Sequence, residues 1–187
     1  MIIHISGASG SGKTTMGNNL KKKYKNKIIV KDLDDLFLEF MNEKGYNWNK
    51  KFNPKIYQKY INDFINKQHK PIIFVGLNMD MWHNPEHYYD VKADYKFYID
   101  MDIETIFKQK CERFIRKIFG ERINDFLENV ISNEKETLKR ISEMMKKYEC
   151  SFNAIKKINK KRNKDYKKMG YNFMNQKNIY QKIFNIL

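Results

Sequence analysis

The 187-residue sequence contains few cysteines, few prolines and no long apolar run. With only two cysteines, Cys111 and Cys150, neither a disulfide framework nor a four-cysteine zinc cluster is available. No segment offers the roughly 18 consecutive apolar residues that indicate a transmembrane helix. The first residues, MIIHIS, lack the basic segment that begins a secretory signal. We therefore expect a protein of the reducing cytoplasm with no membrane partner.

Arginine and the acidic residues are scarce relative to lysine. The sequence has 37 Lys and Arg against 22 Asp and Glu, a formal net charge of +15, and only five of the basic residues are Arg. Such an excess of positive charge is typical of nucleic-acid-binding proteins. The abundance of Lys, Asn and Ile, with very little Ala, also fits the codon bias of an AT-rich genome. The charge leaves a nucleic-acid partner open and predicts attraction to phosphorylated molecules, long or short.

The apolar residues that are present form a regular pattern. They make up 41% of the sequence and aromatic residues 14%, which excludes an intrinsically disordered chain. Short runs rich in Ile, Val, Phe and Tyr predict strands at 1–5, 28–30, 72–75 and 95–99, with a short fifth strand at 170–174. Segments with helical spacing follow or separate them, at 13–25, 33–43, 56–65, 103–118 and 176–187. This alternation indicates an α/β fold, a parallel sheet with helices on both faces.

The remaining residues belong to the same predicted domain. Residues 121–150 are charged and favour helix, with an apolar stripe at helical spacing. Residues 151–168 are rich in Lys and Asn, and we expect them to be loosely ordered. We interpret 1–187 as a single domain in which 113–150 form a candidate helical lid.

The most informative segment follows the first predicted strand. Residues 7–14, GASGSGKT, match the pattern G-x-x-x-x-G-K-[ST] between a strand and a helix. Glycines let the backbone curl so that its N–H groups point at phosphate oxygens, and the helix N-terminus adds partial positive charge. We expect Lys13 to reach the β- and γ-phosphates of ATP and Thr14 to bind Mg²⁺. The alternative is a glycine-rich turn with an accidental Lys-Thr. The predicted nucleotide-binding residues are Gly7, Ala8, Ser9, Gly10, Ser11, Gly12, Lys13, Thr14 and Thr15.

Three acids follow the second predicted strand: Asp32, Asp34 and Asp35. Ligands of open α/β sheets bind beyond the carboxyl ends of the strands, so an acid here lies near the transferring phosphate. One acid could accept a proton from an acceptor hydroxyl or hold Mg²⁺ through water. Asp34 is our first choice and Asp32 our second, for both roles. The alternative is helix capping by Asp34 or Asp35.

Three of the five arginines fall within ten residues, at Arg113, Arg116 and Arg122. Arginine forms bidentate bonds with phosphate that lysine cannot form. A lid bearing these residues could close over the transferring phosphoryl group and exclude water. The alternative is that they form a solvated helix face.

Together these segments resemble the P-loop small-molecule and nucleotide kinases, the group that includes adenylate, uridine and shikimate kinases. The resemblance rests on IIHISGASGSGKTT, on DLDD after the second strand, on a third strand ending in Gly76, and on YKFYID followed by a helix with Arg113 and Arg116. It implies the three-layer P-loop NTPase fold with a five-stranded sheet in the order 2-3-1-4-5 and a helical lid. It also implies a substrate-binding or catalytic acid at Asp34 and a lid carrying the three arginines. The D-G-F-P-R segment of adenylate kinases and the glycine triplet of shikimate kinases are absent, which leaves the acceptor open.

Our leading hypothesis is a kinase that transfers the γ-phosphoryl group of ATP, with Mg²⁺, to a small acceptor such as a nucleoside or nucleoside monophosphate. A second hypothesis is a 5′-hydroxyl polynucleotide kinase, since positive charge and aromatics suit single strands. A third is a non-catalytic nucleotide switch whose Lys-rich segment 156–168 binds nucleic acid or an acidic partner.

Overall fold

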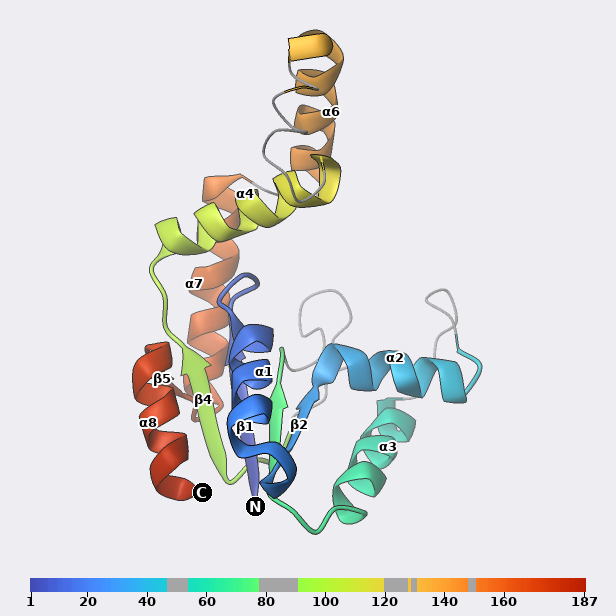
Figure 1. Cartoon of the computed structure of the whole chain (residues 1–187), viewed down its shortest axis with the longest axis vertical. Coiled ribbons are helices and arrows are strands. Elements are labelled where there is room, and N and C mark those ends of the chain that lie inside the picture. The colour runs from blue at the N-terminus through green and yellow to red at the C-terminus, as the bar shows by residue number, and fades with distance from the viewer. Residues whose placement is uncertain (47–53, 78–90, 120–127, 129–130, 148–150) are drawn as a thin grey trace. The chain divides into compact units, whose positions relative to one another are not determined.

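The computed structural model describes residues 1–46, 54–77, 91–119, 128, 131–147 and 151–187 (Figure 1). The chain divides into two compact units. The first contains Met1–Gly7, Gly12–Asp100 and Gly170–Leu187, and the second contains Ala8–Ser11 and Met101–Met169. The phosphate-loop sequence therefore contributes to both units.

The first unit is built on a five-stranded parallel sheet. Its strands are β1 (Ile2–Gly7), β2 (Ile29–Asp32), β3 (Ile72–Val75), β4 (Tyr95–Ile99) and β5 (Asn172–Met174). They lie in the order β2-β3-β1-β4-β5, and every neighbouring pair is parallel. The predicted sheet order is confirmed. The central strand β1, which is buried along most of its length, leads directly into the phosphate loop.

Helices cover both faces of this sheet. Residues of α1 (Lys13–Tyr24) and α8 (Gln176–Ile186) pack against Ile3, Ile5 and Val75 on one face. Residues of α2 (Leu33–Glu43) and α3 (Pro54–Asn66) pack against Ile72 and Phe74 on the other. A short 3₁₀ turn, Lys25–Lys27, connects α1 to β2. The three-layer α/β arrangement predicted from the alternating pattern is confirmed.

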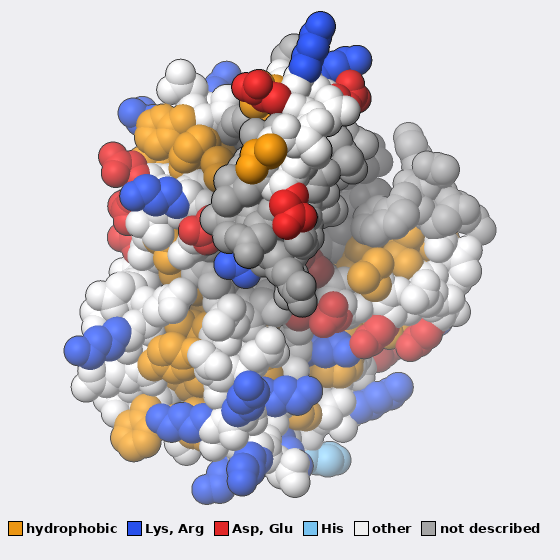
Figure 2. Space-filling view, turned by 45° about the horizontal axis from the view of Figure 1, so that its top comes forward, with side chains coloured by type: hydrophobic (Ala, Val, Ile, Leu, Met, Phe, Trp, Pro, Cys, Tyr) orange, Lys and Arg blue, Asp and Glu red, His pale blue; other side chains and the backbone are white. Residues whose placement is uncertain are grey.

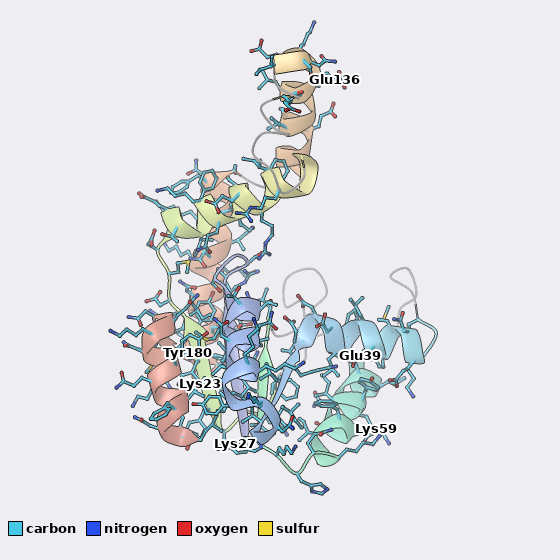
Figure 3. All side chains as sticks on the ribbon, viewed as in Figure 1. Lys23, Lys27, Glu39, Lys59, Glu136 and Tyr180 are labelled. Atoms are coloured by element: carbon cyan, nitrogen blue, oxygen red, sulfur yellow. The ribbon has the colours of Figure 1, made fainter. Side chains whose placement is uncertain are left out.

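Contacts between α1 and α8 fix the helix that follows the phosphate loop. The Tyr180 hydroxyl donates to the carbonyl oxygen of Met16 at 3.5 Å. The Lys23 ammonium lies 4.9 Å from the ring centroid of Phe184. Figure 3 labels Tyr180 on α8 and Lys23 on α1, where the two helices lie side by side. The C-terminal helix therefore supports α1 from the side.

The second unit is helical. It contains α4 (Ile103–Phe119), α6 (Glu134–Lys147) and α7 (Phe152–Lys168). Asp102 caps α4, because its carboxylate accepts bonds from the Thr105 amide at 2.8 Å and the Thr105 hydroxyl at 2.6 Å. A small apolar cluster joins α4 and α7 to the loop residue Ala8, with Ile106 and Ile155 buried beside it. The middle of the phosphate loop is thus packed into this unit.

One segment differs from its prediction. Residues 151–168 were expected to be loosely ordered, but they form α7. Lysine is a good helix former, and the charged side chains project into solvent. Ile155 and Tyr166 are buried on one face, about three turns apart. Ser151 caps the helix, because its hydroxyl oxygen accepts a bond from the Ala154 amide at 3.1 Å. The cap and these two buried side chains are enough to order a Lys-rich helix.

This cap gives a testable stability effect. Ser151→Ala removes the acceptor for the Ala154 amide and is expected to lower the free energy of unfolding by about 1 kcal/mol. Urea denaturation followed by circular dichroism measures it. Asn153→Ala, an exposed change in the same helical turn, is the control and should alter stability far less. Equal effects of the two substitutions would show that the cap is not what stabilises α7.

Basic side chains are spread over the face of the described residues shown in Figure 2. Lys and Arg side chains appear in several parts of the face shown in Figure 2, mixed with polar and apolar ones. Among the described helices, none is long and apolar enough to cross a membrane.

Candidate active site

The phosphate loop has the backbone conformation that its glycines permit. Gly10 and Gly12 have φ angles of +91° and +81°, a region that other residues rarely adopt. The Ser11 amide donates to the Ala8 carbonyl at 3.0 Å, which closes a turn. Helix α1 begins after Gly12, without a side-chain cap and without an acidic residue in its first turn. Its N-terminus therefore keeps the partial positive charge that attracts phosphate.

Lys13 and Thr14 begin α1, and both side chains point to the predicted site. The Lys13 ammonium donates to the carbonyl oxygen of Gly7 at 2.9 Å, so it folds back over the start of the loop. The Thr14 hydroxyl donates to Asp32 Oδ2 at 3.1 Å. Thr15, the last predicted loop residue, is exposed one position further along the helix. The structure thus joins β1, α1 and the end of β2 through Gly7, Thr14 and Asp32.

Asp32 has two contacts that its position in the sequence did not reveal. Strand β2 ends at Asp32, and α2 begins at the next residue. Asp32 is the N-cap of α2, because its Oδ1 accepts a bond from the Asp34 amide at 3.0 Å. The alternative that Asp34 or Asp35 caps this helix is therefore wrong. Their carboxylates are left in the first turn of α2, where the helix dipole stabilises negative charge.

Asp34 has the perturbed carboxyl group of this cluster. Partial desolvation by the surrounding protein raises the pKa of Asp34 above its ordinary value, and the negative charge of Asp32 raises it further. The positive charge of Lys13 opposes this shift, and Asp35 adds a smaller increase. A carboxylate that holds a proton more tightly than usual is a better base in its ionised form. Asp32, Asp34 and Lys13 therefore form one electrostatic cluster in the first unit.

Magnesium binding was predicted at Thr14, Asp32 and Asp34. Thr14 and Asp32 bring a hydroxyl and a carboxylate oxygen within 3.1 Å of each other, and oxygen donors are what Mg²⁺ prefers. Across the described part of the chain, no cluster of three or more His, Cys, Asp or Glu could hold a metal ion. The donor set fits Mg²⁺, which usually takes one or two protein ligands and completes its shell with phosphate oxygens and water.

The second unit adds α4 to the loop. A Cβ atom placed on Gly10 would lie 3.6 Å from Lys110 Cγ and 3.7 Å from Gln109 Cβ, so α4 packs directly against the loop here. Arg113 and Arg116 lie further along α4, and both are exposed. The predicted Arg122 lies outside the described residues. Arg113 and Arg116 therefore stay candidates on the same helix that contacts the loop.

Lys110 was missed by the sequence interpretation. It occupies the helical stripe that contains Ile106 and Phe114, both buried, and it is itself partly buried. A lysine within an apolar stripe was the available signal, but in a chain with so many lysines it did not stand out. Its side chain lies against the phosphate loop at Gly10.

Gly12 gives a second testable effect. A Cβ on Gly12 would lie 2.6 Å from Gln176 Nε2 of α8, and its positive φ disfavours any other residue. Gly12→Ala is expected to weaken ATP binding by about 5- to 150-fold, since left-handed backbone costs about 1–3 kcal/mol outside glycine. Isothermal titration with ATP measures this.

The variant Gly12→Ala/Gln176→Ala separates the two causes. It removes the side-chain collision but not the backbone strain, so it should recover only part of the lost affinity. Full recovery would mean that the φ of Gly12 is unimportant, and unchanged affinity in Gly12→Ala would contradict both causes.

A cytidine diphosphoramidate kinase of Campylobacter jejuni is 26% identical over 161 residues, which cover 84% of this chain and 91% of that protein. The chain resembles the P-loop kinases. This confirms the resemblance inferred from the loop. No protein-family model matches the chain.

Solved structures of kinases are also similar. A shikimate kinase of Acinetobacter baumannii aligns with 99% of this chain and 91% of its own, at 11% identity and a TM-score of 0.40. A thymidylate kinase of Ehrlichia chaffeensis aligns with 71% of this chain and 97% of its own, at 19% identity and a TM-score of 0.35. These overall similarities are modest, and the fold assignment rests on the chain's own strand order and its loop between β1 and α1.

Proposed function

We propose that this chain is an ATP-dependent kinase that transfers the γ-phosphoryl group to a hydroxyl group of a small, nucleotide-like acceptor. The observation that carries the proposal is the cluster of Lys13, Thr14, Asp32 and Asp34 in the first unit. It combines a phosphate loop with an acid of raised pKa in the first turn of α2, just beyond the carboxyl end of β2. Phosphoryl transfer needs positioning, charge stabilisation and, for a hydroxyl acceptor, a proton acceptor.

On the donor side, the loop amides and the N-terminus of α1 bind the phosphates of ATP. Lys13 exchanges its bond with the Gly7 carbonyl for bonds to phosphate oxygens, and thereby stabilises charge on the transferring group. Thr14 and Asp32 are the residues that would hold Mg²⁺. When bound, the ion neutralises charge on the phosphate oxygens.

On the acceptor side, Asp34 accepts the proton of the attacking hydroxyl. An acceptor that is already a phosphate needs little help from a base, so an acid with a raised pKa favours a hydroxyl. Arg113 and Arg116, which are exposed on α4, and Arg122 are proposed to bind phosphate groups when the lid closes.

The acceptor class follows from the relative and the charge together. The name of the Campylobacter jejuni relative gives cytidine diphosphoramidate as its acceptor. This compound carries ribose hydroxyls and an anionic diphosphate-like group. A basic protein with a net charge of +15 attracts such an anion. A cytosine nucleotide with a phosphoramidate or phosphate chain is therefore the first acceptor class to test.

The test is ATP consumption against a panel of acceptors with Mg²⁺. The panel contains cytidine diphosphoramidate, cytidine nucleotides, other nucleosides and nucleoside monophosphates, small hydroxy acids and 5′-hydroxyl oligonucleotides. Turnover that depends on one nucleotide-like acceptor supports the proposal. Tight ATP binding without turnover on any acceptor would favour a nucleotide switch instead.

The positive charge of α7 favours a second candidate, the 5′-hydroxyl polynucleotide kinase. Its lysines are exposed along the helix: Lys156, Lys157, Lys160, Lys161, Lys164, Lys167 and Lys168. Such a row suits a nucleic-acid backbone, and binding through it would fall steeply with salt. Turnover confined to oligonucleotides at low salt, and lost at high salt, would favour this candidate over the small acceptor.

A further inference from the structure

His4 is a buried titratable residue that the proposed chemistry does not use. It lies in the middle of the central strand β1, paired with Phe74 of β3 and Lys96 of β4. Its side chain is fully buried. A buried polar side chain needs partners for its hydrogen-bonding atoms, or it destabilises the fold. The partners of the two ring nitrogens therefore show what this histidine does.

Both ring nitrogens have a partner in the first unit. Nδ1 lies 2.5 Å from the hydroxyl of Tyr171, and Nε2 lies 3.2 Å from the carbonyl oxygen of Gly76. Burial, with smaller contributions from the nearby charges of Lys96 and Lys13, lowers the pKa of His4 to about 3, so the ring is neutral at neutral pH. A neutral imidazole carries one N–H, and a carbonyl can only accept. Nε2 therefore donates to Gly76, and Nδ1 accepts from the Tyr171 hydroxyl.

Gly76 is held from two sides. Its amide donates to the Ile5 carbonyl at 3.1 Å, and its carbonyl accepts the bond from His4. Its φ of +138° is available to glycine but strained for other residues. A Cβ on Gly76 would lie 3.0 Å from Leu33 Cβ, so the backbone passes in close contact with Leu33. The bond from His4 thus fixes a backbone segment that packs against the start of α2.

Leu33 connects this backbone to the acids. It is the first residue of α2, it is buried, and it stands between Asp32 and Asp34 in the chain. Asp32 binds the Thr14 hydroxyl and the Asp34 amide. A shift of Gly76 would move Leu33, and with it the two carboxylates on either side. A displacement of about 1 Å at reacting groups can cost about 100-fold in rate.

We propose that His4 is a positioning residue for the acid pair, because its Nε2–H bond to Gly76 holds the backbone on which Leu33, between Asp32 and Asp34, is packed. The role in catalysis rests on the proposed function of Asp34. The Gly76 carbonyl, which can only accept, fixes the proton on Nε2, and the bond from the Tyr171 hydroxyl to Nδ1 contributes to stability rather than to turnover.

Two substitutions of His4 separate its two bonds. Gln can place an amide N–H near the position of Nε2, and Asn can place an amide oxygen near the position of Nδ1. His4→Gln keeps the donor to Gly76, whereas His4→Asn keeps the acceptor for Tyr171. We expect His4→Asn to lower kcat by about 10- to 100-fold with the KM for ATP nearly unchanged. We expect His4→Gln to retain kcat within about threefold of the wild type, with a similar loss of stability. Equal kcat values for the two variants would overturn the proposal.

A third variant covers the case in which His4 variants do not fold. Tyr171→Phe removes the hydroxyl but leaves the bond between His4 and Gly76. It should lower the melting temperature while kcat stays near that of the wild type. A loss of kcat as large as that expected for His4→Asn would show a general structural role and overturn the proposal.

A readout without activity separates this inference from the proposed function. The ¹⁵N shifts of the wild-type ring should show a proton on Nε2 and no titration between about pH 5 and pH 8, as the lowered pKa requires. The ¹³C carboxyl shifts of Asp32 and Asp34 should change in His4→Asn and stay near wild type in His4→Gln. If no acceptor is ever phosphorylated but these shifts behave as expected, the proposed function fails while the positioning of the acids stands. A proton on Nδ1, or acid shifts that do not respond, overturns the inference itself.

Discussion

Replacing Lys13 by Met is expected to lower turnover by about 10²- to 10³-fold, the largest effect expected for any substitution other than that of Asp34. The ammonium lies at the start of the loop, bonded to the Gly7 carbonyl, where its charge can pass to phosphate oxygens. Losing one preorganised charge-stabilising donor typically costs this much in kcat. Acceptor-dependent ATP consumption under saturating ATP measures the effect.

The control keeps the same change of charge on the same helix. Lys22 lies on α1 and is exposed, so Lys22→Met should leave kcat within about twofold because surface changes have small effects. Comparable losses in both variants would mean that net charge, not the position of Lys13, controls turnover. Lys13→Met also discriminates against the nucleotide switch, because a scaffold would keep its binding to nucleic acid.

Much of the fold could be read from the sequence because the strands are short and continuously apolar. Runs such as 72–75 are buried on both faces, which is the pattern of a parallel sheet. The order of the strands came from the resemblance, which the structure confirms. Helix α7 was missed because a Lys- and Asn-rich composition indicates solvation, and only Ile155 and Tyr166 mark its buried face. Two side chains three turns apart give too weak a periodic signal to detect.

The sequence predicted those site residues that belong to a recognisable motif. Lys13 and Thr14 belong to a pattern with a physical mechanism, and the structure places both beside Gly7 and Asp32. The sequence did not predict that Asp32 caps α2 while Asp34 has the raised pKa, because this depends on the residue at which β2 ends. Lys110 contacts the loop and His4 contacts Gly76. Both contacts join segments that are distant in the chain, so the spacing of residues in the sequence does not predict them.

Asp34→Asn is expected to lower kcat strongly without lowering the melting temperature. If Asp34 takes the proton of the acceptor hydroxyl, kcat should fall by about 10²- to 10⁴-fold while ATP affinity changes little. Asn cannot accept that proton, but it nearly preserves the shape of the side chain. Initial rates and ATP titration separate the two quantities, and unchanged turnover would exclude Asp34 as the base.

Asp35→Asn is the matched control for charge. It removes the neighbouring carboxylate in the same turn of α2, and its effect on kcat should be much smaller. Because Asp35 contributes to the raised pKa of Asp34, its removal should move the acid limb of the pH–rate profile slightly to lower pH. A shift to higher pH would contradict the assigned electrostatics.

The stability of Asp34→Asn follows from the direction of the pKa shift. A carboxyl whose pKa is raised on folding binds its proton more tightly in the folded state, so its stabilising contribution is present below the pKa of the unfolded chain. That contribution is lost as the pH rises through the folded pKa, and at neutral pH the ionised group weakens the fold. Removing the charge should therefore leave the melting temperature of Asp34→Asn at pH 7 unchanged or slightly higher. The wild-type protein should gain stability relative to Asp34→Asn as the pH falls toward the ordinary Asp range. Such a trade of stability for activity is expected of a carboxylate kept for its chemistry, whereas one kept for structure would destabilise the fold when replaced.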